Sequence, residues 1–397
     1  MLLFAAVFAT LSASKRTTPP LPLVDTTIFK GGEGDYNTYR IPAIVQTMQP
    51  NVLLAFAEGR KLSSSDHGWN DIVQKRSTDN GRSWSSNLTV VHGESAPGKL
   101  VTIGNPAPIL DSNTGRVFML YSRNNAKVGV LHSDDEGISW SGVTDLTDTL
   151  MAKNNWTTIF TGLSAGFTLA VPSAGSTGAD SGAAAKSRLL VCSNHDGPAS
   201  PAGSTGRNVG RYSSTIYSDD GGETWVAGAD VGPAGSTECN VGSTGRGGVF
   251  MYSRLWNQGA GKPTFGIAQS DDGGVTFPKG FSNAGMGWPQ PDCEGTMRVG
   301  KAPPSSTLSP SSPSGTGGEP CFMLSAPYGN GRANITLSHT CGDVPGEWVH
   351  DRVLWQGPAA YSAMDTSIDG STLFVAYERG EKSPYEEIHL NTVRCPL

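Results

Sequence analysis

The chain has few charged residues and lacks any block of basic ones. Charged side chains make up 16% of its 397 residues, and the formal net charge is −6. Binding to nucleic-acid phosphates needs clustered lysine and arginine, so this pattern argues against a nucleic-acid partner. After residues 2–13, no apolar run is long enough to cross a bilayer. An anionic ligand would therefore have to be met by a few focused cations.

Cysteines at metal-binding spacing are also lacking. The six cysteines show no CxxC pattern, which argues against a zinc site. Their even number favours one to three disulfides, but spacing alone does not decide how they pair. Cys321 and Cys341 flank two strand-like runs and are the best candidates for one bridge.

The beginning of the chain predicts secretion. Residues 2–13 are apolar and end in small residues, as in a secretory signal, although the usual charged start is missing. A first buried strand or an untrimmed tail is the alternative. We expect residues 1–16 to be a signal or propeptide and the protein to be extracellular. Three N-glycosylation acceptors agree with this, at Asn87, Asn155 and Asn334.

Repeats are the most informative feature of the sequence. With 51 glycines and 26 prolines, the composition favours many short strands joined by turns. The pattern S-x-D-x-G-x-x-W/F occurs four times, at residues 77–84, 133–140, 218–225 and 270–277. The aspartate can bond nearby backbone amides, the glycine takes a positive φ, and the aromatic residue anchors the turn. Because a strand-like run precedes each copy, each repeat predicts a β-hairpin.

These repeats resemble the Asp-box of sialidases and of some other propellers. Copies roughly 50 to 85 residues apart fit four-stranded blades with long loops. We therefore expect an all-β fold, a six-bladed β-propeller, in which residues 17–397 form a single catalytic domain. Ser/Pro/Gly-rich tracts are interpreted as surface insertions, with linkers as the alternative; they span residues 172–186, 197–206 and 301–320. Asp-boxes occur in propellers of different activity, so they leave the function open.

Unrepeated residues in the first part of the chain resemble the sialidase family more specifically. The run Y-R-I-P around Arg40 is similar to the family motif that supplies the first arginine of a substrate clamp. Arg60, Asp66 and Asp71 follow in the family's order before the first Asp-box. The resemblance implies that Asp66 is the general acid/base and that Arg60 helps to hold the site. A solvated loop carboxylate is the alternative for Asp66, while Asp71 beside an apolar pair suggests structural support or substrate contact.

Two further arginines complete the implied clamp. Glu238 precedes Arg254 as in the family pairing of a glutamate with the second clamp arginine. Taken alone, Glu238 could be a carboxylate at the rim of the site. Arg332 lies where a Gly-rich loop leads into a strand-like run, and the resemblance makes it the third arginine.

The segment G-P-A-A-Y-S resembles the part of the family that carries the nucleophile. This similarity implies that Tyr361 is the nucleophile and that Glu238 removes its proton. If the alignment slips, Tyr328 and Tyr385 are the other candidates.

These residue types form a consistent chemistry. Three guanidinium groups can bind the carboxylate that a sialic acid carries on its anomeric carbon. That carboxylate would repel an acidic nucleophile, whereas a neutral phenol can approach it. The resemblance implies a retaining exo-α-sialidase that acts on terminal Neu5Ac or KDN of sialylated glycans through a covalent sialyl-tyrosine. It implies no metal or organic cofactor, and we expect a monomer.

Several alternatives remain open. Residues 161–167 depart from the family's Gly-Pro-Gly-x-Gly-Ile segment, which often lines the sugar pocket, so the choice between Neu5Ac and KDN is undecided. A trans-sialidase, or an intramolecular variant that releases an anhydro-sugar, would use the same catalytic set. A non-catalytic sialic-acid-binding propeller would lose Asp66, Glu238 or Tyr361, all of which are present. A xyloglucan-type hydrolase would need a carboxylate pair and no arginine triad. We therefore expect hydrolysis first and transfer second.

Overall fold

The computed structural model describes most of the chain. The described residues are 24–152, 154–171, 186–197, 210–244, 248–256, 264–284, 292–301, 320–329, 331–342 and 347–395. The expected signal at residues 1–16 lies outside them, as do most of the three Ser/Pro/Gly-rich tracts. Within the described ranges, no helix has the length and apolar character needed to span a membrane.

The described residues form an all-β fold with one short helix, α1 (Thr147–Met151). Four sheets are separate from one another. The first contains β2 (Thr38–Gln46), β3 (Leu53–Arg60), β4 (Asn70–Ser77) and β5 (Thr89–His92). The second contains β6 (Ile103–Leu110), β7 (Val117–Arg123), β8 (Lys127–Ser133) and β9 (Thr144–Asp145). The third contains β10 (Thr158–Thr161), β11 (Phe167–Val171), β12 (Lys186–Asp196), β13 (Arg211–Ser218) and β14 (Val226–Ala227). The fourth contains β15 (Ser236–Ser243), β16 (Val249–Leu255), β17 (Thr264–Ser270) and β18 (Ser282–Asn283).

The prediction of six four-stranded blades is wrong, because the remaining strands form one seven-stranded sheet. Its order is β1-β24-β23-β22-β21-β20-β19. The cause is the 18-residue strand β22, which pairs with β21 through its first part and with β23 through its second. Hydrogen bonding therefore continues where the repeat spacing predicted a break. The strands are β1 (Val24–Lys30), β19 (Thr296–Lys301), β20 (Pro320–Pro327), β21 (Ala333–Cys341), β22 (Val349–Thr366), β23 (Thr372–Arg379) and β24 (Glu387–Arg394).

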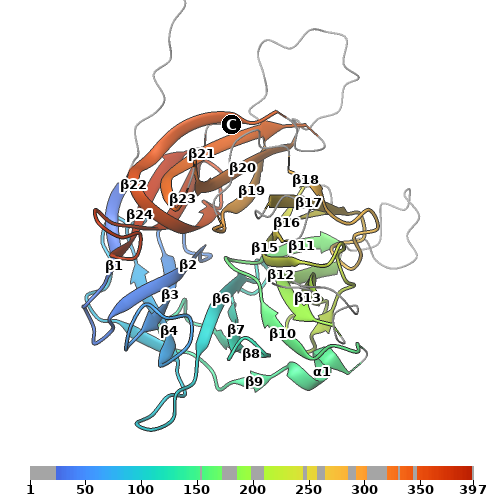
Figure 1. Cartoon of the computed structure of the whole chain (residues 1–397), viewed down its shortest axis with the longest axis horizontal. Coiled ribbons are helices and arrows are strands. Elements are labelled where there is room, and N and C mark those ends of the chain that lie inside the picture. Colours follow the sequence, from blue (N-terminus) through green and yellow to red (C-terminus); the bar gives the residue numbers. More distant parts are fainter. Residues whose placement is uncertain are drawn as a thin grey trace, which may run out of the picture.

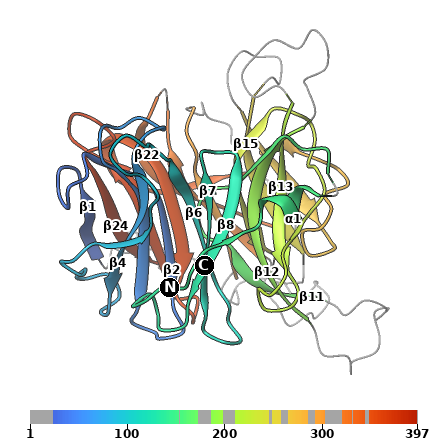
Figure 2. The ribbon, with the colours of Figure 1, turned by 90° about the horizontal axis from the view of Figure 1, so that it is seen from below.

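The sheets surround a central axis (Figure 1), and their strands run along that axis in the side view (Figure 2). The core lies between neighbouring sheets. One apolar cluster joins Phe56 of β3 to Ile103 of β6, and another joins Leu53 of β3 to Phe374 of β23. Strand β1 pairs antiparallel with β24, so the two ends of the described chain meet in one sheet. This propeller arrangement directs the β2, β6 and β15 edges of their sheets towards the axis (Figure 1).

All four Asp-boxes form the predicted hairpin turns. Each connects the last two strands of a separate sheet, as between β8 and β9. In that copy, Ser133 Oγ donates to Asp135 Oδ1 at 2.8 Å and accepts the Gly137 amide at 2.8 Å, while Ser139 Oγ donates to Asp135 Oδ2 at 2.6 Å. The other three copies repeat this network, which involves the aspartates Asp79, Asp220 and Asp272.

Two disulfides join strands. The predicted Cys321–Cys341 bridge is confirmed and links β20 to β21. A second bridge, Cys192–Cys239, was not singled out from the sequence and connects β12 to β15, which belong to different sheets. It therefore ties two neighbouring sheets together close to the axis.

Candidate active site

Irregularities in the axis-facing strands bring side chains into one site. The pairing of β2 shifts after Arg40, that of β6 after Gly104, that of β15 after Thr237 and that of β22 after Ala359. Such β-bulges re-aim side chains that regular alternation would send elsewhere. The redirected residues line one cavity: Ile41, Asn105, Glu238 and Tyr361. The first three also have positive φ, an uncommon conformation for residues other than glycine.

Tyr361 and Glu238 are in direct contact. The phenol of Tyr361 donates to Glu238 Oε1 at 2.7 Å, and Glu238 Oε2 forms an ion pair with Arg254. Burial, followed by the negative charge of Glu238, raises the pKa of Tyr361 well above its ordinary value. The phenol is therefore neutral in the free site and has a carboxylate in position to accept its proton.

The three arginines predicted to form a clamp surround Tyr361. The Cζ atoms of Arg40 and Arg332 each lie 5.2 Å from the centre of the Tyr361 ring, and Arg254 reaches the same group through Glu238. The Arg40 side chain is 5% exposed. Burial acts to lower the pKa of Arg40, but the charge and hydrogen bond of Glu378 raise it above the ordinary value. Glu378 therefore keeps this buried guanidinium charged.

Asp66 lies at the solvent-exposed side of the site. It accepts a 2.8 Å bond from Arg60 Nη1, while Arg60 is held from behind by two bonds to Glu58 at 2.7 and 2.9 Å. Partial burial acts to raise the pKa of Asp66, but the charge and hydrogen bond of Arg60, with help from Arg40, bring it below the ordinary value. In the free site, Asp66 is thus an ionised carboxylate next to a fixed guanidinium.

Asp71 lies apart from these groups. Its carboxylate accepts bonds from the Tyr36 hydroxyl at 2.8 Å and the Trp69 indole at 3.2 Å. Burial raises the pKa of Asp71, against the effect of those two bonds. Asp71 does not line the cavity described next, so of the two roles suggested by the sequence, its contacts favour structural support.

The cavity at the axis has a volume of about 280 Å³. The Tyr361–Glu238 pair, the Arg60–Asp66 pair and polar side chains of the second and third sheets all line it: Asn105, Asn125, Thr161, Asn194 and Arg211. None of the three clamp arginines is among the lining residues. The clamp therefore borders the cavity at Tyr361, and a ligand held by the clamp would extend from there into the cavity. Among the described residues, no group of His, Cys, Asp and Glu is arranged to hold a metal ion.

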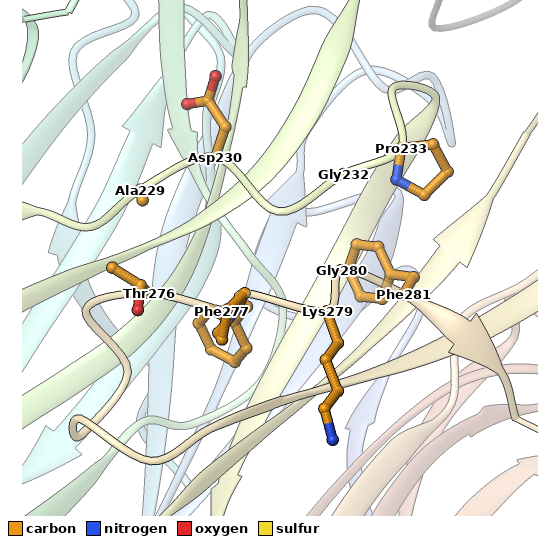
Figure 3. A pocket seen from close by; sticks show the side chains of 10 residues that line it. Ala229, Asp230, Gly232, Pro233, Thr276, Phe277, Lys279, Gly280 and Phe281 are labelled. Carbon is orange, nitrogen blue, oxygen red and sulfur yellow. The ribbon is translucent and has the colours of Figure 1, made fainter.

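A larger cavity of about 480 Å³ lies elsewhere, between the loops that follow β14 and β17. Figure 3 shows that Asp230 and Lys279, its two charged side chains, point in different directions. None of the predicted catalytic or substrate-binding residues lines it, although Thr276 and Phe277 of the fourth Asp-box do. Because its polar groups do not converge, its larger volume does not make it the better candidate.

The two alternative tyrosines occupy other environments. The Tyr385 hydroxyl accepts a 2.8 Å bond from Arg332, and the Tyr385 ring lies 4.1 Å from the Arg40 guanidinium, so it supports the clamp. Tyr328 is 37% exposed and packs against His350. Of these tyrosines, Tyr361 is the one bonded to Glu238.

Sequence reasoning missed two supporting carboxylates. Glu378 binds Arg40 Nε at 2.7 Å and also accepts the backbone amides of Ile41 and Tyr361. A lone acidic residue at the end of the apolar run Leu373–Tyr377 was the available signal. Asp292 was missed as well; its side chain pairs with Arg254 at 3.1 Å and its carbonyl accepts bonds from Arg332. It comes from a Pro/Gly-rich stretch with no pattern to mark it.

Comparison with known proteins identifies relatives over most of the chain. A family model described as a BNR repeat-like domain matches residues 51–374. Sialidase-3 of Mus musculus is 26% identical over 422 residues, which span 93% of this chain and 94% of that protein. A sialidase of Micromonospora viridifaciens is 27% identical and matches 91% of this chain, but the match spans 52% of that longer protein.

Solved structures share the fold. The Hadza microbial sialidase Hz136 superposes with a TM-score of 0.71 at 21% identity, covering 93% of this chain and 68% of that one. A Trypanosoma rangeli sialidase in complex with 2,3-difluoro-KDN superposes with a TM-score of 0.66 at 16% identity, covering 92% and 58% of the two chains. At these identities the superpositions establish the similarity of the fold.

Proposed function

The chain belongs to the sialidase family, with a BNR repeat-like domain, and on this basis we propose that it is a retaining exo-α-sialidase. Sialidases are glycoside hydrolases, and the proposed substrates are terminal sialic acids, Neu5Ac or KDN, of glycans. The observation that carries the proposal is the 2.7 Å hydrogen bond from Tyr361 to Glu238 within a ring of arginines.

Tyr361 is the proposed nucleophile. As the Tyr361 oxygen forms a bond to the anomeric carbon, Glu238 Oε1 takes the phenolic proton. Negative charge therefore develops on the phenol oxygen only during its attack on the sugar. A raised pKa makes this base necessary, because the isolated phenol would keep its proton at neutral pH. The product of the first step is a covalent sialyl-tyrosine.

The arginines are proposed to orient the sugar through its carboxylate. Arg40, Arg254 and Arg332 lie around the phenol ring and can form charge-assisted hydrogen bonds with a carboxylate on the reacting carbon. This arrangement selects sugars that carry an acid group at the anomeric carbon.

Asp66 is proposed to exchange protons with the leaving group and with water. It gives a proton to the glycosidic oxygen as the bond to the anomeric carbon breaks, and then removes a proton from the water that attacks the same carbon. The water displaces Tyr361, which recovers its proton from Glu238, and two displacements at one carbon give net retention. In the free site the pKa of Asp66 is lowered by Arg60, so substrate must raise it. A bound sugar does this by excluding water and by adding a nearby negative charge.

The size of the cavity supports removal of one terminal sugar at a time. A volume of about 280 Å³ falls just below the range of about 300–1,000 Å³ typical of pockets for drug-sized ligands. A single sugar matches this space, whereas a chain of sugars would need an open groove.

Product stereochemistry tests the proposal directly. The purified protein is incubated with aryl α-glycosides of Neu5Ac and of KDN, and the first-formed anomer is followed by NMR. Initial release of the α-anomer from either substrate is expected; initial release of the β-anomer, or no cleavage of either, would refute the proposal. A fluorinated sialosyl inhibitor should attach to Tyr361, and an adduct mapped by mass spectrometry to a different residue would reject the nucleophile.

A further inference from the structure

A disulfide lies at the seam between two sheets, next in the chain to the proposed base. Cys239 follows Glu238 on β15 and is bonded to Cys192 on β12, a strand of the neighbouring sheet (Figure 1). Both cysteines are buried, and neither lines the cavity. On the basis of the proposed function, we propose that this inter-sheet bridge is a positioning element, which holds Glu238 and residues 162–163 in the geometry needed for proton transfer from Tyr361.

Glu238 needs such support because its own strand does not hold it. The pairing of β15 with β16 shifts between Thr237 and Cys239, so Glu238 is the extra residue of the bulge. Its φ of 50° is unfavourable for a residue other than glycine, and such a conformation persists only where the surrounding structure fixes it. A cross-link at the next residue fixes the backbone where the hydrogen bonds of the ladder do not.

The other end of the inter-sheet bridge is a fixed point. Strand β12 pairs with β13 in one continuous register, and Cys192 lies within it, opposite Thr215. The Cα atoms of Cys192 and Cys239 are 5.9 Å apart. Because a disulfide confines its two Cα atoms to a separation of roughly 4.4–6.8 Å, the irregular strand β15 cannot move far from the regular strand β12.

The inter-sheet bridge also anchors the chain beside Tyr361. The amide of Gly162 donates to the Cys192 carbonyl at 2.8 Å, and the amide of Leu163 donates to the Cys239 carbonyl at 3.0 Å. This close approach requires glycine, because a Cβ on Gly162 would lie 2.5 Å from the Cys239 carbonyl oxygen. Leu163 in turn lines the cavity and belongs to the buried apolar cluster that contains Tyr361. The anchoring therefore reaches the proposed nucleophile as well as the base.

The second disulfide, the within-sheet bridge, offers an internal comparison. Cys321 and Cys341 are directly opposite each other in the β20–β21 ladder, whose register is regular. Backbone hydrogen bonds already hold these two strands together, and neither cysteine lines the cavity. Loss of the within-sheet bridge should therefore affect stability alone, whereas loss of the inter-sheet bridge should also affect catalysis.

Paired alanine variants test this difference. Cys192→Ala/Cys239→Ala removes the inter-sheet bridge, Cys321→Ala/Cys341→Ala is the matched control, and both should lower Tm. With an aryl α-sialoside that the wild type cleaves, loss of the inter-sheet bridge is expected to lower kcat about 10- to 100-fold, because a displacement of about 1 Å can cost about 10²-fold. KM should stay within about threefold, since two of the clamp arginines come from other sheets. The control should keep the wild-type kcat.

Hydrogen exchange gives a readout that does not depend on activity. Without the inter-sheet bridge, the amides of Gly162 and Leu163 should exchange at least about tenfold faster, because local opening frees them from the two carbonyls that they bind. Mass spectrometry of a peptide that covers residues 159–167 measures this exchange. The control variant should retain the wild-type rate.

Gly162→Ala tests the same contact while both bridges stay intact. The added methyl group pushes the segment away from the Cys239 carbonyl, so kcat should fall at least about tenfold with KM little changed. Gly142→Ala is the matched control, since a Cβ at that position meets no heavy atom of the described residues within 4 Å.

The outcomes separate this role from the proposed function. If the wild type cleaves its sialoside, a wild-type kcat in Gly162→Ala and in the variant without the inter-sheet bridge would overturn the positioning role. An equal loss of kcat in the control without the within-sheet bridge, or unchanged exchange at Gly162 and Leu163, would do the same. A wild-type chain that cleaves no sialoside would instead refute the proposed function, and with it the base that the bridge is proposed to position.

Discussion

The outer turns of this protein repeat the same residues from sheet to sheet, whereas the axis-facing strands differ in sequence at corresponding positions. The four Asp-boxes at the outer turns carry the same residue types and the same hydrogen bonds, as at Ser133 and Ser218. At the axis, corresponding bulges carry different residues in each sheet: Ile41, Asn105 and Glu238. The same residues recur at the outer turns because each of these turns has to form the same hairpin. Different residues occur at the axis because several sheets contribute side chains to one asymmetric cavity.

The two regions also differ in their electrostatics. The Asp-box carboxylates lie near the surface and are satisfied by local hydroxyl and amide donors, as at Asp135. At the axis, buried charges depend on partners far away in sequence, such as Arg40 on Glu378. Removing a charge should therefore affect stability at the outer turns and chemistry at the axis. The following predictions test this division.

The largest effect is expected for Tyr361→Phe. Loss of the phenol oxygen removes the proposed nucleophile and should lower kcat by about 10³-fold or more, while Tm stays near that of the wild type. Tyr328→Phe, which removes a phenol outside the cavity, is the matched control. The measurements are steady-state kinetics and thermal unfolding. A near-wild-type kcat in Tyr361→Phe would contradict the prediction that residues at the axis control the chemistry.

Asp66→Asn should have a smaller and substrate-dependent effect. General acid catalysis contributes about 10²–10⁴-fold, so kcat/KM for a natural sialylated glycan should fall in that range. For an aryl sialoside with an acidic phenol as leaving group, the fall should be at least about tenfold smaller, because that phenol needs little protonation. Equal losses on both substrates would contradict the assignment of Asp66 as the acid.

Asp135→Ala should change stability and not catalysis. It removes the carboxylate that bonds Ser133 and Ser139 in the second Asp-box, and we expect Tm to fall by about 2 °C with kcat/KM unchanged. Asp271→Ala is the control, since this exposed carboxylate forms no bond or ion pair within the described ranges. A kinetic defect in Asp135→Ala would show that the outer turns also shape the site.

The smallest effect is a pH dependence at the same turn. Hydrogen bonds from Ser139 lower the pKa of Asp135 to about 2, below the value of 3.8 for an ordinary aspartate. Because its pKa is lower in the folded than in the unfolded chain, the ionised Asp135 carboxylate stabilises the fold at pH values above its ordinary pKa. This stabilisation is lost as the pH falls from about 4 towards about 2. The difference in Tm between wild type and Asp135→Ala should shrink over that window. A difference that stays constant down to pH 2 would contradict it.

Prediction from the sequence worked best for repeated features and for residues within motifs. The hairpin turns at the Asp-boxes and the Cys321–Cys341 bridge could be predicted because their signals are local. The number of blades was predicted wrongly, because repeat spacing does not show that β22 continues from one pairing into the next. The secretory signal, the acceptor asparagines and the choice between Neu5Ac and KDN stay predictions.

The sequence contains one further pattern that could have located a residue of the site. The run Ile41-Pro42-Ala43 at the bulge of β2 is matched by Asn105-Pro106-Ala107 at the bulge of β6. Proline cannot donate to a strand ladder, so it is accepted at bulges, and the repeated pair marks corresponding positions in two sheets. Asn105 could have been placed at the axis by this comparison. Asp292 could not, because nothing local links it to two arginines.

The sequence by itself determined the all-β class, the turns and the residue types of the chemistry, since hydrogen bonds and alternation within short segments encode them. Only the tertiary structure decided which groups meet. Tyr361 and Glu238 are 123 residues apart, and Arg40 and Glu378 are 338 apart, yet each pair shares a hydrogen bond of 2.7 Å. Such contacts depend on how sheets pack around the axis and on bulges that redirect single side chains, and no local pattern specifies either.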